Sequence, residues 1–84
     1  MECYATFRKG RWVEYKPTAT VISDPRWTDA HRWMAAAAYA TAITKGLPEA
    51  RAIILSEAYV FKQLYPELSY TKDLEAGIAS ITRE

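Results

Sequence analysis

The stretch that decides the fold is residues 3–16, CYATFRKGRWVEYK, in which apolar and polar side chains roughly alternate on either side of Lys9-Gly10. Glycine readily adopts the positive φ of a tight hairpin turn, so this pattern predicts an antiparallel hairpin that turns at this pair. A two-residue turn places Phe7 opposite Trp12. The same register places Tyr4 opposite Tyr15, Ala5 opposite Glu14, and Thr6 opposite Val13.

This register divides the aromatic side chains between the two faces of the hairpin. Phe7 and Trp12 share one face, and Tyr4 and Tyr15 share the other, because successive side chains of a strand point to opposite sides. The arginines on either side of the turn lie on the tyrosine face. Helices that follow can cover only one face, so we expect one aromatic pair to stay exposed.

The segment after the hairpin predicts a third strand. Pro17 ends the second strand because proline has no amide hydrogen for the ladder. Residues 18–22, TATVI, are rich in β-branched side chains, which favours a short strand there.

Three helices are predicted beyond this point. Thr28 is a plausible N-cap for a helix that runs to Lys45 and is closed by Gly46. Two more helices are predicted after it. Pro48 begins a second helix that runs to about Tyr65, and Ser69 or Thr71 caps a third helix with Leu74, Ile78 and Ile81 on one stripe. The order predicts an α+β fold, an N-terminal hairpin of two or three strands packed on three C-terminal helices, with the alanine-rich first helix near the centre.

Composition sets the class of protein. The chain has 84 residues, of which 50% are hydrophobic and 25% charged, which predicts a single small globular domain over residues 1–84. Cys3 is the only cysteine, so no intramolecular disulfide can form, and we expect a cytoplasmic protein. The longest strongly apolar run, 33–43, is shorter than the ~20 residues that span a bilayer. We therefore expect no membrane association and no signal peptide.

The predicted second helix contains an acid in an apolar setting. Glu57 falls inside a continuous apolar arc, and its neighbours three and four positions away cannot pair with a carboxylate. The members of this arc are Ala50, Ile53, Ile54, Val60, Phe61, Leu64 and Tyr65. We expect Glu57 to be a buried charge whose partner is Arg26, Arg32, or a tyrosine or tryptophan donor. The alternative is a proton-transfer acid or ligand contact in a cleft.

Other chemistry is weakly indicated. Cys3 and His31 could form a nucleophile and base pair, but no Gly-rich turn accompanies either residue to supply an oxyanion hole. Asp24 and Asp29 together with His31 offer metal donors, although acids at these positions are typical of caps and first turns. The three glycines are isolated, which excludes phosphate-binding loops of the Gly-rich kind. We predict no catalytic residue, no metal and no cofactor.

Two surfaces are predicted for binding. Leu55 and Tyr59 lie on the side of the second helix opposite the apolar arc, flanked by Arg51 and Lys62, which indicates a protein contact patch. The hairpin combines aromatic and basic side chains, the two components of a surface for single-stranded nucleic acid or another partner. Its candidate residues are Tyr4, Arg8, Lys9, Arg11, Trp12 and Tyr15.

The function expected from these features is non-enzymatic. We expect a small protein-binding module, a regulator or inhibitor of a larger assembly, whose partner is another protein or a second copy of itself. One alternative is nucleic-acid binding through the hairpin, residues 3–16. Another is a small enzyme or ligand-binding protein that uses Glu57.

Overall fold

The computed structural model describes residues 3–83 and begins with the predicted hairpin. Strands β1 (Tyr4–Arg8) and β2 (Arg11–Tyr15) pair antiparallel in the predicted register, with Phe7 opposite Trp12. Lys9 and Gly10 have φ of 51° and 79°, the two successive positive values of a type I′ turn. This turn matches the twist of the strands, and the predicted pairing is confirmed.

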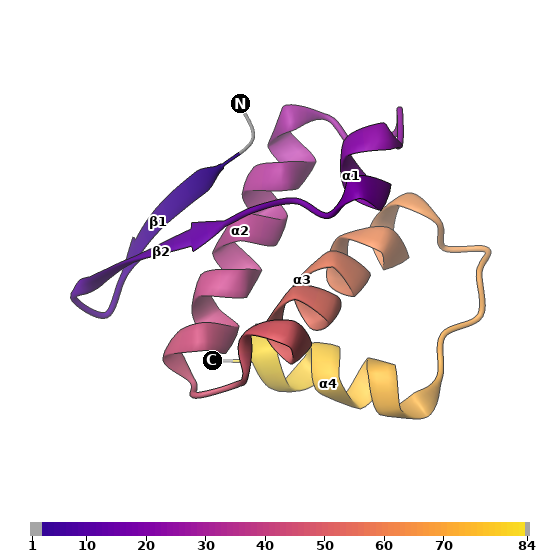
Figure 1. Ribbon diagram of the computed structural model, residues 1–84. Helices are drawn as coiled ribbons and strands as arrows, with labels where there is room; N and C mark the ends of the chain where they lie inside the picture. The colour runs from indigo at the N-terminus through magenta and orange to yellow at the C-terminus, as the bar shows by residue number, and fades with distance from the viewer. Residues whose placement is uncertain (1–2, 84) are drawn as a thin grey trace.

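Four helices joined by loops follow the hairpin, so the predicted α+β class is confirmed (Figure 1). They are α1 (Ala19–Ser23), α2 (Asp29–Thr44), α3 (Glu49–Leu64) and α4 (Lys72–Thr82). Thr28 and Thr71 are the N-caps of α2 and α4, and the Thr71 side chain accepts a hydrogen bond from the Leu74 amide at 3.1 Å. Gly46 follows α2 with a φ of 96°, a value that glycine adopts without strain.

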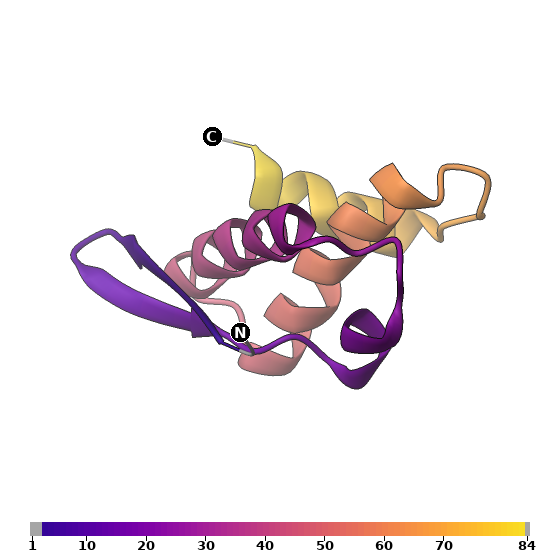
Figure 2. The ribbon, with the colours of Figure 1, turned by 90° about the horizontal axis from the view of Figure 1, so that it is seen from above.

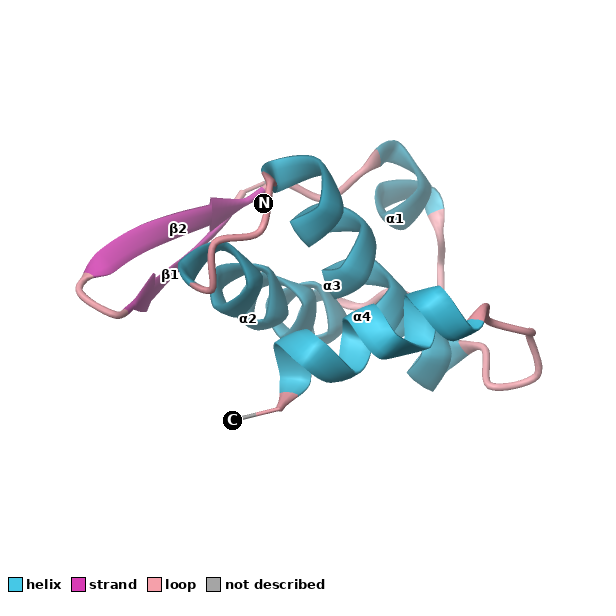
Figure 3. Cartoon of the chain, turned by 90° about the horizontal axis from the view of Figure 1, so that it is seen from below, coloured by secondary structure: helices cyan, strands magenta, loops and turns pink. Residues whose placement is uncertain are grey.

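Helix α2 is the centre of the fold, as its alanines predict. The hairpin packs on one side of α2, and α3 and α4 contact it elsewhere (Figures 2 and 3). Small side chains let a neighbouring element approach closely, which explains a helix built largely of alanine. Its buried alanines are Ala35, Ala36, Ala38, Ala40 and Ala42. In Figure 2 the turn of the hairpin projects beyond the helices.

The predicted third strand is wrong, because residues 19–23 form the short helix α1. Thr18 is the N-cap, and its carbonyl accepts a helical hydrogen bond from the Ile22 amide at 3.0 Å. The Thr18 amide donates to the carboxylate of Glu57 at 3.1 Å rather than to a neighbouring strand. β-propensity describes how well a side chain fits a pleated surface. The sheet ends at Tyr15, and the segment after it bonds to Glu57 of α3 instead of to a strand.

The tyrosine face of the hairpin is the face that is buried. Tyr4 and Tyr15 are both 0% exposed. The ring of Tyr4 meets Trp33 of α2 edge to face, with centroids 4.8 Å apart, and the ring of Tyr15 lies 5.8 Å from that of Tyr39. Aromatic side chains thus join the hairpin to α2, and the opposite face of the hairpin is left for solvent.

Helix α3 buries more than the single arc predicted for it. Leu55 is 1% exposed, whereas two members of the predicted arc, Ala50 and Ile54, are exposed. The reason is α4, which packs on α3 and covers a second side of that helix. A Cβ atom added at Gly77 of α4 would lie 2.6 Å from the Leu55 Cδ2 atom, so any other residue there would force the Leu55 side chain to move.

Candidate functional site

The outer face of the hairpin carries two large exposed aromatic side chains, which we call the outer aromatic pair. Phe7 is 57% exposed and Trp12 is 67% exposed. Their rings meet edge to face with centroids 5.2 Å apart, across a strand pair that the turn makes a non-hydrogen-bonded one, where side chains approach most closely. The two rings therefore support each other in an orientation that keeps both in contact with water.

Three cations surround the turn next to this pair, but they do not share its face. Arg8 and Arg11 lie opposite each other on the inner face, and Lys9 is exposed in the turn itself. The outer aromatic pair and the two arginines thus occupy opposite sides of one narrow ribbon. A partner that reaches around the turn would meet both sets of side chains.

Two of the residues predicted to contact nucleic acid or another partner do not lie on the surface. Tyr4 and Tyr15 have no exposed surface, because the helices cover the face on which they lie. Phe7 was missed by the prediction of this surface, although the register already placed it opposite Trp12. This pairing with Trp12 could have identified Phe7 as part of the same surface.

Glu57 is buried, as predicted, and its partners are hydrogen-bond donors from the end of β2 and from the segment that follows it. The Tyr15 hydroxyl donates to Oε2 at 2.6 Å, and the Thr18 hydroxyl donates to Oε1 at 2.8 Å. With the Thr18 amide, three donors reach the carboxylate. Burial, followed by the bond to Glu57, strongly raises the pKa of the Tyr15 phenol. A tyrosine was among the predicted partners of Glu57, and the bond from Tyr15 confirms that prediction.

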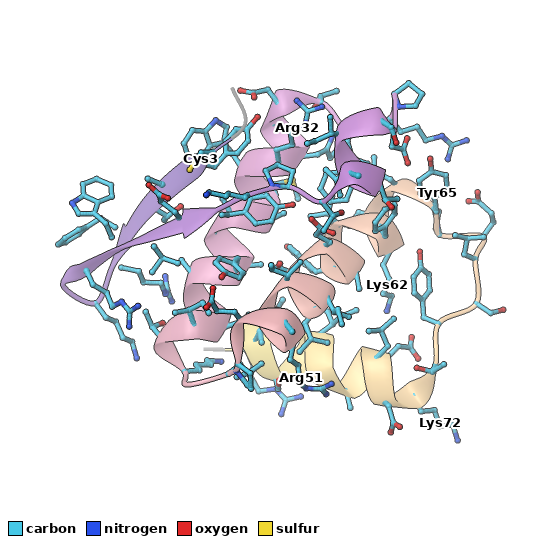
Figure 4. The ribbon with its side chains drawn as sticks, in the orientation of Figure 1. Cys3, Arg32, Arg51, Lys62, Tyr65 and Lys72 are labelled. Carbon is cyan, nitrogen blue, oxygen red and sulfur yellow. The ribbon has the colours of Figure 1, made fainter. Side chains whose placement is uncertain are left out.

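The two arginines considered for Glu57 have other surroundings. Arg26 stacks on the ring of Tyr65, with 4.4 Å from its Cζ atom to the centroid, and donates to the Leu64 carbonyl at 3.0 Å. Arg32 lies beside the Tyr4 phenol at the N-terminal end of α2 (Figure 4). The Glu57 carboxylate is therefore held by neutral donors, an arrangement that ties the hairpin to α3.

Cys3 and His31 are each engaged separately. Burial and the neighbouring Glu14 carboxylate raise the pKa of the Cys3 thiol, which keeps it in its less nucleophilic form. The His31 Nδ1 atom accepts a hydrogen bond from the Thr28 amide at 3.2 Å and so closes the capping box of α2. Their surroundings give each a local role in the fold.

The predicted contact patch on α3 is covered by the chain itself. Leu55 is buried against α4, and Tyr59 is partly buried against the core. Lys62 forms an ion pair with Glu75 of α4 at 3.1 Å, and the Arg51 side chain lies close to Gly77 (Figure 4). The prediction of an exposed Leu55 and Tyr59 patch is therefore wrong, because α4 occupies the place assigned to a partner.

Two features are absent from the part of the chain that the structure describes. Within residues 3–83, no three His, Cys, Asp or Glu side chains lie close enough to hold a metal ion. In the same range no helix has both the length and the apolar character needed to cross a bilayer.

Comparison with protein-family models, curated proteins and solved structures finds no match for this chain.

Proposed function

We propose that this chain is a small non-enzymatic protein-binding module that acts through the outer aromatic pair. The observation that carries the proposal is the exposure of Phe7 and Trp12, side by side on the face of the hairpin that the helices do not cover. Large apolar rings in contact with water are unfavourable in an isolated domain. Tryptophan and other aromatic side chains supply much of the binding energy at protein interfaces, in pockets that exclude water.

The charges around the pair favour an acidic partner surface. Lys9 is exposed in the turn, and Arg8 and Arg11 lie on the other side of the ribbon, so a partner that reaches around the turn would meet all three cations. The net charge of the whole chain is only +1, so this positive charge is a local property of the turn. A protein with an apolar pocket rimmed by carboxylates would complement both features. A module that only occupies such a pocket would act as a regulator or inhibitor of its partner.

Site-specific photo-crosslinking tests this proposal. A photoreactive phenylalanine analogue would replace Trp12, and a matched variant would carry it at Leu68, which is also exposed but lies in the loop before α4. In cells of the source organism, the position 12 variant is expected to form one discrete adduct that the position 68 variant does not form. The adduct should disappear when Phe7→Ser is added.

The result that would contradict the proposal is equally definite. Identical adduct patterns from both variants would remove the outer aromatic pair as a binding surface. An adduct of twice the mass of the chain would identify a second copy as the partner. Because both rings are exposed, the Phe7→Ser change should leave the melting temperature nearly unchanged, which separates lost binding from lost folding.

Single-stranded nucleic acid is the second candidate partner, favoured by the exposed indole of Trp12 and by Lys9, which is exposed in the adjoining turn. Bases stack on aromatic rings, and lysine and arginine contact phosphates. Affinity for an oligonucleotide should then fall steeply as salt rises, and both Trp12→Ala and Lys9→Ala should weaken it. Flat titrations at low salt would exclude this candidate and leave the protein partner.

A further inference from the structure

A pocket of about 280 Å³ lies on the inner side of the hairpin, away from the outer aromatic pair. It is formed where β1 ends against α2 and the last turn of α4. Its apolar side chains are Met34, Ala37, Ala38 and Ile81. Its polar side chains are Arg8, Thr41, Tyr59 and Thr82.

Arg8 is the unusual member of this lining. Its Nε atom is buried, yet it has no hydrogen-bond partner among residues 3–83. No carboxylate in that range pairs with its guanidinium, and the Nε atom of Arg32 and the Nε1 atom of Trp27 are likewise buried without a partner there. A buried donor without an acceptor is unfavourable, and more so when it belongs to a charged group, so an anion that reaches the Arg8 guanidinium would stabilise it.

Among residues 3–83, one of the three hydroxyl groups that line the pocket is free to donate to a bound anion. Thr41 and Thr82 donate to helical carbonyls, to Ala37 at 3.1 Å and to Ile78 at 2.9 Å. The Tyr59 hydroxyl makes no hydrogen bond to residues 3–83 and is available as a donor. The pocket thus combines one cation and one neutral donor with an apolar floor.

We propose that this pocket is an anion site for a carboxylate attached to a short apolar group. The guanidinium of Arg8 would receive the carboxylate through charge-assisted hydrogen bonds, and the apolar group would cover the alanine surface of α2. At ~30 Å³ for each water molecule, the pocket has room for roughly nine non-hydrogen atoms. Such a carboxylate could come from a free monocarboxylic acid or from the C-terminal residue of a polypeptide. The site does not depend on the function proposed for the outer aromatic pair.

Nuclear magnetic resonance titration of the full chain tests the site, with hexanoate as the first probe. Hexanoate should shift the resonances of Met34, Ala37 and Ala38 in a saturable way, with a Kd on the order of 1 mM for so small a ligand. Hexan-1-ol, which lacks the charge, should bind at least about tenfold more weakly. Acetyl-Gly-Gly-Leu with a free C-terminus, compared with its C-terminal amide, distinguishes the two sources. Tighter binding of the free peptide than of hexanoate assigns the site to a polypeptide terminus, and the reverse assigns it to a free acid.

Two variants complete the test. Arg8→Met keeps the length of the side chain but removes its charge, and it should weaken hexanoate binding at least about tenfold. The matched control is Arg11→Met, at the opposite position of the same strand pair but outside this pocket, which should change the affinity by less than about twofold. The proposal is overturned if wild type shows no saturable shift at these residues up to about 20 mM, if hexan-1-ol binds equally well, or if Arg8→Met binds like wild type.

Discussion

The change Tyr15→Phe tests whether Glu57 holds the fold together. It removes one hydroxyl from a side chain that is 0% exposed and keeps the ring that packs against Tyr39. The lost bond, 2.6 Å long, joins the hairpin to a buried carboxylate, and hydrogen bonds to charged groups contribute about 1.5–3 kcal/mol. A domain of this size has a total stability of roughly 4–13 kcal/mol, so the effect should be large. At ~4–8 °C for each kcal/mol, the melting temperature should fall by about 6–24 °C.

Urea unfolding followed by circular dichroism measures this loss, and Tyr39→Phe is the matched control. Tyr39 is also buried, but its hydroxyl makes no hydrogen bond to residues 3–83, so the same chemical change should alter the free energy of unfolding by less than about 0.5 kcal/mol. The midpoint should shift for Tyr15→Phe with an unchanged m-value. Equal effects of the two variants would refute the view that the Glu57 bond stabilises the fold.

Three further predictions follow from the same structure. Glu57→Gln should destabilise the protein by about 1–3 kcal/mol in urea unfolding, because an amide cannot accept from all three donors; unchanged stability would reopen a catalytic role for this acid. Leu55→Asp should abolish cooperative unfolding because it buries an unpaired charge under α4, and a folded variant would show that α4 does not cover this position. Burial raises the pKa of Tyr4 and Tyr15, so their contribution to stability is complete below about pH 10 and is lost as the pH rises further. Absorbance at about 295 nm should therefore show tyrosine ionisation coinciding with alkaline unfolding, and ionisation of the whole set while the chain remains folded would contradict this.

The hairpin was predictable because its signals are local. Alternation of side chains and a glycine in the turn define the register, which in turn pairs Phe7 with Trp12. Which face the helices would cover was not predictable, since both faces carry aromatic residues. The prediction of a third strand was wrong because it rested on β-propensity alone. Residues 18–22 have that propensity, but the amide of Thr18 donates to the carboxylate of Glu57 and not to a neighbouring strand.

The candidate sites depended on tertiary contacts that periodicity does not reveal. A helical wheel assumes one buried face, but α3 lies between α2 and α4 and so buries Leu55 on its second side. Gly77 in α4 was the sequence signal for this close helix contact, although its partner helix could not be named in advance. The helical wheel correctly predicted that Glu57 is buried. It could not show that Tyr15 is the tyrosine donor, because that depends on how the hairpin lies against α3.

The bond between Tyr15 and Glu57 has a consequence for the order in which the chain can become stable. It joins residues 42 positions apart, although the hairpin itself closes over a two-residue turn. A two-stranded hairpin is marginal in water by itself, and contacts between distant residues form late because they must close a long loop. During synthesis the N-terminal hairpin would therefore lack the bond to Glu57 until α3 has been made. A ribosome-bound chain that ends before Glu57 should leave the Tyr15 hydroxyl without its acceptor, even where α2 already covers the tyrosine rings.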